Sequence, residues 1–369
     1  MLLGKENEMK KRIISLLIAT TMLFSVFTGC GDSKESSNGD AYTVRVATMT
    51  TGFTVALHYA IEQGIYDELG INVEESFFDN GPSINEAIAA GDIDVGGIGE
   101  MPAITGALAN GSKVIAWMED DAASVQIYAR NDSDIVSAGE GHIADCPAIY
   151  GTKSEWKGKE IICATGTSSH FALLATLNAL GLKESDISII NMEGSAGAAA
   201  FASGTGDLFV GFDPQWANMY ANKDEYTMVS SIEAANQELS CFLIGSDDFV
   251  SNHEKEAELI VKGLLMAQNE LREDEELYKE AMYNWQATFG GQDEELAAYS
   301  ASLKPFRTVE EQAEMMDDEE GVSPILDSMI MVANFMADNN LIEKSDIDAL
   351  KDMNPVNKDI FTAAASTLE

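Results

Sequence analysis

A run of three hydroxyl side chains, Thr167, Ser168 and Ser169, follows a glycine in the stretch ATGTSSHFALLATLNALG. Hydroxyls and free backbone N–H groups at the start of a helix favour an anion. The stretch lacks the lysine of a phosphate-binding P-loop, so it does not predict a nucleotide. Helix capping is the alternative, but a cap uses only one hydroxyl. We therefore predict an anion site, to which His170 adds a donor unless it is a packing residue.

Two carboxylates occupy similar positions in other predicted turns. Glu100 lies in GEMP and Asp213 in FDPQW, each beside a proline at a helix start. Asp before Pro is also a common start signal, so Asp213 has a capping alternative, whereas Glu100 is a poorer cap. Two carboxylates facing an anion site would suit a zwitterion, which carries both charges.

A fourth turn, TTGF, follows the first predicted strand and completes the candidate site. Phe53 and Trp216 would either wall the site or pack in the core. Ligands of open α/β sheets bind beyond the carboxyl ends of the strands, where all four turns are expected. The predicted ligand-binding residues are Thr51, Gly52, Phe53, Gly99, Glu100, Met101, Thr167, Ser168, Ser169, His170, Asp213 and Trp216.

The N-terminal segment MKKRIISLLIATTMLFSVFTGC predicts secretion. A basic start at residues 10–12 precedes an apolar run over 13–27, which is shorter than the ~20 residues that span a bilayer. MLLGKENE before it is acidic, so Met9 is the expected start. The segment resembles a bacterial lipobox, which implies that residues 1–29 are removed and that Cys30 is lipidated. An ordinary secretory signal with a chance cysteine is the alternative.

Composition narrows the function further. The chain has a net charge of −40, and removal of residues 1–29 leaves 18 Lys and Arg against 60 Asp and Glu, a net charge of −42. Such a protein is repelled by nucleic acid and by anionic lipid. Cys146, Cys163 and Cys241 remain, an odd number without a CxxC motif, so we predict neither metal nor cofactor. A bridge between Cys146 and Cys163 stays open.

Strand and helix patterns alternate twice along the chain, which indicates open, mostly parallel sheets with helices on both faces. A polar, irregular stretch at 131–157 separates the two series, and the chain from residue 250 is helical. The expected strands are 42–49, 71–78, 93–100, 113–120, 124–132, 158–166, 186–192, 207–213, 226–231 and 238–249. The expected helices between them are 51–70, 81–92, 101–111, 167–181, 195–206 and 214–222.

This order predicts an α/β fold of two doubly wound lobes joined by two crossover strands, near 124–130 and 240–246. Residues 30–41, CGDSKESSNGDA, form a flexible tether with no bulky apolar side chain. Lobe 1 comprises 42–129 and 246–369, with the helical C-terminal tail on it, and lobe 2 comprises 130–245. The crossovers would act as a hinge.

At these turns the chain resembles the nitrate/sulfonate/taurine group of ABC-transporter substrate-binding proteins. The stretches EAIAAGDIDVGGIGEMPAITGALANG, WKGKEIICATGTSSHFALLATLNALGLKESDISIINM and SGTGDLFVGFDPQWA carry the resemblance, which runs from about Val44 to Phe249. It implies the type II periplasmic-binding-protein fold, with ligand contacts at 99–101, 167–170 and Asp213. Phe212 replaces a tryptophan common before Asp-Pro, and the 131–157 stretch is longer than usual.

We therefore predict a lipid-anchored, monomeric, extracytoplasmic solute-binding component of an ABC importer, which delivers a small organic anion or zwitterion to a permease with a cytoplasmic ATPase. The best candidate is taurine or another aliphatic sulfonate. Alternatives are a thiamine-precursor pyrimidine, an amino acid, nitrate or bicarbonate, or a role as a ligand-sensing receptor. Pyrimidine synthases of similar fold use lysine and histidine chemistry; the four turns hold no lysine and only His170, so we do not predict an enzyme.

Overall fold

The computed structural model describes residues 42–289, 293–318 and 321–368. The predicted signal peptide, the tether and the lipidation site at Cys30 lie outside these residues. No helix in the described part is long and apolar enough to cross a membrane.

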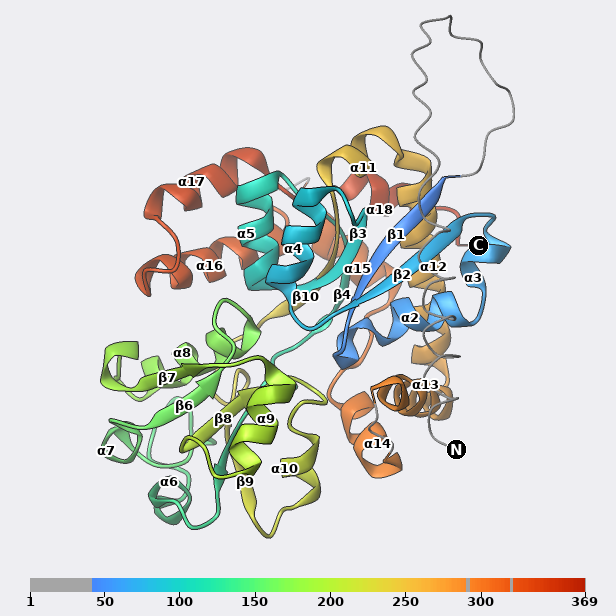
Figure 1. The fold of residues 1–369 in the computed structure, drawn as a ribbon. Coiled ribbons are helices and arrows are strands. Elements are labelled where there is room, and N and C mark those ends of the chain that lie inside the picture. The colour runs from blue at the N-terminus through green and yellow to red at the C-terminus, as the bar shows by residue number, and fades with distance from the viewer. Residues whose placement is uncertain (1–41, 290–292, 319–320, 369) are drawn as a thin grey trace, which may run out of the picture. The chain divides into compact units, whose positions relative to one another are not determined.

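The first sheet has the strand order β2-β1-β3-β10-β4 (Figure 1). β1 pairs in parallel with β2 and β3, whereas β10 runs antiparallel between β3 and β4. Its strands are β1 (Thr43–Met49), β2 (Asn72–Phe78), β3 (Val95–Gly99), β4 (Lys113–Asp120) and β10 (Ser240–Gly245). β3 reads VGGIG and is buried throughout, because small residues let helices pack closely on both of its faces.

The second sheet repeats this arrangement with the order β7-β6-β8-β5-β9. β6 pairs in parallel with β7 and β8, and β5 runs antiparallel between β8 and β9. Its strands are β5 (Gln126–Arg130), β6 (Glu160–Cys163), β7 (Ser188–Asn191), β8 (Leu208–Gly211) and β9 (Tyr226–Ser231). The predicted α/β fold with two doubly wound sheets is confirmed.

The chain passes between the two sheets after β4 and again after β9. β5 lies in the second sheet, although residues 126–129 were expected in lobe 1, and β10 lies in the first sheet, although residues 240–245 were expected in lobe 2. Each strand follows its crossover and completes the sheet it enters. We therefore propose that the lobes are divided between β4 and β5 and between β9 and β10.

Helices connect the strands and cover the sheets, as the alternating pattern predicts. Those of the first series are η1 (Gly52–Thr54), α2 (Val55–Glu62), α3 (Ile65–Glu68), α4 (Gly81–Ala90) and α5 (Glu100–Asn110). Those of the second are α6 (Asp134–Ala138), α7 (Lys153–Trp156), α8 (Ser168–Ala179), η2 (Glu184–Asp186), α9 (Gly194–Ala202) and α10 (Ala217–Ala221). The irregular 131–157 stretch thus holds two short helices, each with a capped start at Ser133 or Thr152.

The rest of the described chain is helical, as predicted from residue 250 onward, although the first helix begins at Asp247, where the strand was still expected, because Ser246 caps it. Its helices are α11 (Asp247–Asn252), α12 (Glu254–Glu273), α13 (Glu275–Thr288), α14 (Glu294–Ser302), α15 (Val309–Met316), α16 (Pro324–Asp338), α17 (Lys344–Met353) and α18 (Lys358–Ala365). α12 packs beside α2 and α18, and α16 packs beside α5, so these helices cover the first sheet (Figure 1).

One helix of this tail, α14, packs on α13 and also contacts the second sheet. α14 carries Leu296 into the hydrophobic cluster of the second sheet, and Tyr299 stacks on Tyr220 of α10 with ring centroids 4.4 Å apart. The Tyr299 hydroxyl also accepts a hydrogen bond of 3.1 Å from Gln126 of β5. α14 therefore also contacts the second sheet, which the prediction of a tail on the first lobe did not include, because Tyr299 and Leu296 face α10.

The three cysteines of the described chain are buried and free. Cys146 and Cys163 therefore do not form the bridge that the sequence left open. They serve as small apolar side chains in the core.

Candidate ligand-binding site

The turns at the strand ends of the two sheets meet each other. The Gly52 amide of η1 donates a hydrogen bond of 3.2 Å to the Asp213 carbonyl, which follows β8. A Cβ atom placed on Gly99 would lie 2.6 Å from Ser168 Oγ at the start of α8, so the Ser168 hydroxyl would have to move for any larger residue. The TTGF turn thus meets the FDPQW turn, and the GEMP turn meets the hydroxyl turn at the start of α8.

The start of α8 is the predicted anion turn. Thr167 is its cap: Thr167 Oγ1 accepts a hydrogen bond of 3.2 Å from the Ser169 amide and donates one of 2.7 Å to the Ala164 carbonyl. Ser169 Oγ is buried and has no hydrogen-bond partner among the described residues. Capping therefore accounts for Thr167, and the hydroxyls of Ser168, facing Gly99, and Ser169 remain for another role.

His170 uses both ring nitrogens within the part of the chain that forms the second sheet. The Gly166 amide donates a hydrogen bond of 3.3 Å to Nδ1, and Nε2 lies 3.3 Å from a Glu184 carboxylate oxygen. Burial lowers the pKa of His170, although Glu184 opposes the shift. These contacts favour the packing role over a role as a ligand donor.

Glu100 is fully buried at the start of α5, and protein donors satisfy both of its carboxylate oxygens. The Ser240 amide donates a hydrogen bond of 3.0 Å to Oε2, and the Ser328 hydroxyl donates one of 2.7 Å to Oε1. Burial raises the pKa of Glu100 to about 7, partly offset by these two hydrogen bonds. Glu100 thus joins α5, β10 and α16, and a role in holding an ammonium group has no support in its contacts.

Asp213 differs from Glu100 because one of its oxygens is free. Ser300 of α14 donates a hydrogen bond of 2.6 Å to Oδ1, whereas Oδ2 is buried without a partner among the described residues. Oδ2 lies against Gly52, since a Cβ atom there would come within 2.3 Å of it. Burial raises the pKa of Asp213, opposed by Lys304 and Ser300.

Lys304, which the sequence did not single out, is fully buried beside this turn. Its Nζ atom lies 2.6 Å from Glu119 Oε1, 3.4 Å from Asp121 Oδ1 and 2.9 Å from Ser124 Oγ. The acidic run EDD at the end of β4 was a possible signal for the carboxylates. No local pattern connects it with a lysine more than 180 residues later.

The predicted aromatic residues lie in the core. Phe53 is buried in the main hydrophobic cluster, as is Met101. Trp216 donates a hydrogen bond of 2.9 Å from Nε1 to the Ser124 carbonyl, and its ring meets Tyr299 at 5.7 Å. Thr51 is also buried, and its Oγ1 has no partner among the described residues. Of these four residues, Thr51 alone therefore presents an unused polar atom.

Comparison with known proteins identifies the family. A family model described as "NMT1-like family" matches residues 38–283, which is two thirds of the chain. The chain belongs to the NMT1-like family. A Brachyspira hyodysenteriae protein, named for the periplasmic binding protein of an ABC transporter, is 28% identical over 90% of this chain and 92% of its own length.

Solved structures agree with the fold of this NMT1-like protein. The alkanesulfonate-binding protein of Xanthomonas axonopodis, bound to MOPS, gives a TM-score of 0.66 at 18% identity over 85% of this chain and 98% of that one. The nitrate-binding protein of Synechocystis gives a TM-score of 0.65 at 15% identity, over 89% of this chain and 90% of that one. The predicted recognition as a substrate-binding protein of this group, and not an enzyme, is confirmed by the family and its relatives.

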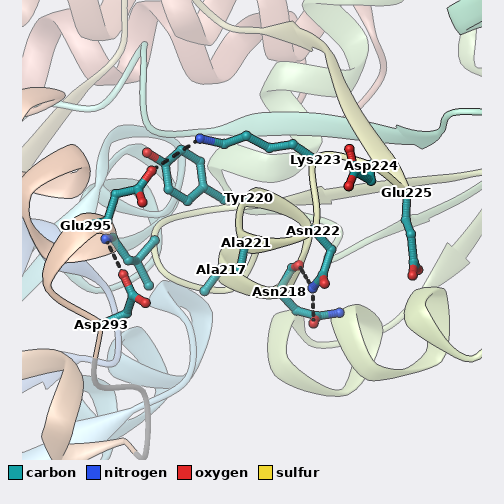
Figure 2. Close-up of a pocket in the computed structure, with 11 residues that line it drawn as sticks. Ala217, Asn218, Tyr220, Ala221, Asn222, Lys223, Asp224, Glu225, Asp293 and Glu295 are labelled. Carbon is teal, nitrogen blue, oxygen red and sulfur yellow. Dashed lines mark hydrogen bonds and ion pairs between the residues drawn. The ribbon is translucent and has the colours of Figure 1, made fainter.

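A separate surface pocket of about 680 Å³ lies over α10 and the start of α14 (Figure 2). Lys223 extends over the ring of Tyr220 toward Glu295, and their 3.4 Å ion pair is exposed to solvent. None of the predicted ligand-binding residues lines this pocket. The unused buried atoms of Thr51, Ser169 and Asp213 thus lie at the predicted turns, and none of these residues lines this pocket.

Proposed function

We propose that this NMT1-like protein is the extracytoplasmic solute-binding component of an ABC importer, which captures a small organic anion or zwitterion and passes it to a membrane permease. Taurine or another aliphatic sulfonate is the best candidate ligand. We further propose that the receptor is a monomer anchored by lipid at Cys30. The coarse role is supported by the family, by the Brachyspira relative and by the periplasmic-binding-protein fold.

The observation that carries the anion proposal is the unused hydroxyl of Ser169. Nearly all buried hydroxyl groups in proteins have a hydrogen-bond partner, so an unpaired one at a helix start needs an explanation. An anion bound at the start of α8 would accept hydrogen bonds from Ser169 and Ser168. The N-terminal end of the 12-residue helix α8 adds a favourable dipole.

The Escherichia coli relative named for binding aliphatic sulfonates is 25% identical over 56% of this chain, which supports a sulfonate. Nitrate is less suitable, because it has no positive group to place beside the free oxygen of Asp213. The ligand is thus expected to combine an oxyanion with a cationic end.

Calorimetry with taurine and ethanesulfonate tests the anion site. Ser169→Ala should weaken both ligands alike, by about tenfold or more, because a hydrogen bond to a charged group contributes ~1.5–3 kcal/mol. Ser203→Ala is the matched control, since Ser203 bonds only the Ala199 carbonyl of its own helix. Absence of binding by any sulfonate, or an unchanged affinity in Ser169→Ala, would contradict the proposal.

The lipid anchor has its own test. Cys30→Ser should move the protein from the membrane fraction to the soluble fraction, because a serine cannot carry the thioether-linked lipid. Cys146→Ser is the control, since that cysteine is buried in the folded chain. Retention of the Cys30→Ser protein on membranes would exclude anchoring at this residue.

A further inference from the structure

Four charged side chains are buried together where the two sheets approach each other. Glu119 is the second-last residue of β4, Asp121 lies in the crossover, Asp213 follows β8, and Lys304 follows α14. Each is at most 1% exposed. The Lys304 ammonium has three hydrogens, and it already reaches Glu119, Asp121 and the Ser124 hydroxyl. One cation therefore faces three carboxyl groups. We call these four residues the acidic group.

Two carboxyl oxygens of the acidic group are unused. Glu119 Oε2 and Asp213 Oδ2 are buried and have no hydrogen-bond partner in the described part of the chain, and the same holds for Thr51 Oγ1. Leaving a buried charged acceptor unpaired costs more than the ~1–3 kcal/mol of a neutral group. The described residues thus provide too few hydrogen-bond donors and too little positive charge for the acidic group.

The unused oxygen of Asp213 lies within the candidate site. A Cβ atom on Gly52 would come within 2.3 Å of Asp213 Oδ2 and 3.0 Å of the Lys304 Cε atom. Asp213 comes from the second sheet, whereas Gly52 and Glu119 belong to the first. A separation of the two sheets would therefore open the acidic group to a ligand.

Neither a metal site nor a purely structural ion pair accounts for the acidic group. The described residues contain no group of three or more His, Cys, Asp or Glu side chains placed to hold a metal ion. A purely structural ion pair would leave two negative charges buried without compensation, because Lys304 neutralises only one carboxylate.

We infer that the acidic group is a cation subsite, which holds one proton when the receptor is empty and exchanges it for a protonated amino group of the ligand. This inference rests on the proposed function, since it describes the end of the ligand opposite the oxyanion. In the exchange, one carboxylic O–H bond breaks and its proton passes to the buffer. The ammonium group of the ligand then donates to the carboxylate.

The charges around the group agree with such an exchange. Burial raises the pKa of Glu119 to about 8, although Lys304 opposes the shift. Burial alone would lower the pKa of Lys304, but the nearby carboxylates raise it, so the lysine keeps its charge. The other groups that face the site are the Tyr278 hydroxyl, which donates to the Lys304 carbonyl, and the Cys241 thiol, whose pKa burial raises. Neither supplies a positive charge.

The first experiment needs no ligand. Infrared spectra of the empty receptor at neutral pH should contain the C=O band of one protonated carboxylic acid beyond that of Glu100, which Glu100→Gln identifies. The extra band should disappear in Glu119→Gln or Asp213→Asn but persist in Asp134→Asn, a control whose carboxylate is 57% exposed. Absence of this band in the wild type would overturn the inference, whatever the ligand is.

The second experiment counts protons. Calorimetry with taurine in buffers of different ionisation enthalpy should show the release of a substantial fraction of one proton at pH 7. Taurine should bind at least tenfold more tightly than isethionate, its hydroxyl analogue, and Asp213→Asn should remove both the preference and the proton release. Equal binding of the two ligands without proton release would overturn the subsite and leave the anion site intact.

A third measurement separates the two proposals if no sulfonate binds. Ethylammonium chloride should raise the melting temperature of the wild type more than sodium chloride at equal ionic strength, and should lose this effect in Asp213→Asn. That result would support the subsite while the sulfonate proposal failed. No specific effect of ethylammonium would overturn the subsite as well.

Discussion

The two sheets of this protein have the same strand order, yet their strand ends carry different chemistry. In each sheet the fourth strand is antiparallel and follows a crossover from the other sheet. The second sheet offers hydroxyls at the start of α8, whereas the first offers the buried carboxyl of Glu119. A repeated scaffold can therefore present a site for each charge of one ligand, because the side chains of the turns are independent of the strand order.

Asp213 is the exception that links the two halves. It follows a strand of the second sheet, but its unused oxygen lies against Gly52 and near Lys304. This difference between the two sheets predicts which substitutions alter the stability of the protein and which alter ligand binding.

Loss of the Lys304 charge should have the largest effect, which we expect on the stability of the protein. Lys304→Met leaves the carboxyls of Glu119, Asp121 and Asp213 without a cation, and removal of one partner of a buried ion pair typically costs ~3–5 kcal/mol. Urea unfolding should show this loss, and adding Glu119→Gln should recover part of it. Lys223→Met, which removes an exposed ion pair, should leave the stability almost unchanged, because water screens such pairs. Equal stabilities of the two single variants would show that the acidic group needs no counter-charge.

A methyl group between Gly99 and the start of α8 should have the next largest effect, which we expect on ligand affinity. Gly99→Ala would place Cβ 2.6 Å from Ser168 Oγ, so the two turns could not approach as closely. We expect about a tenfold loss of ligand affinity. Ser168→Gly in the same chain should relieve the clash, although it also removes one hydroxyl. If Gly99→Ala binds like the wild type, the approach of these turns is not required for binding.

The pH dependence of stability should reveal the buried carboxyl group of Glu100. The pKa of Glu100 rises from 4.5 to about 7 in the folded protein, so folding takes up a proton between these values. Its contribution is complete below about pH 4.5 and is lost as the pH rises through about 7. The stability of the wild type relative to Glu100→Gln should therefore fall over this range. Calorimetric melting of both proteins from pH 5 to pH 8 tests this, and a constant difference would contradict it.

The smallest effect is expected at His170. Both ring nitrogens of His170 have partners, Gly166 and Glu184, so His170→Gln should change ligand affinity by less than about threefold. Ser169→Ala should have the larger effect on ligand affinity. A large loss of affinity with unchanged stability would restore His170 to the ligand site.

The fold was predictable from the sequence because its signals are local. Alternating strands and helices, and the run of hydroxyls after Gly166, need only neighbouring residues to be recognised. The acidic group was not predictable, since Lys304 reaches carboxyls more than 180 residues earlier and follows no periodic pattern. The roles of Phe53 and Trp216 were also undecided, because an aromatic residue at a helix start has the same sequence pattern in a core and in a site wall.

The position of β10 has a consequence for export. β10 lies between β3 and β4, so these two strands have no direct pairing and the first sheet stays divided until residue 245 is available. A chain that is delivered with its N-terminus first therefore cannot complete this sheet from its first 120 residues. Such long-range pairing slows folding. A protein that must cross a membrane in extended form would gain time from this delay before its strands close.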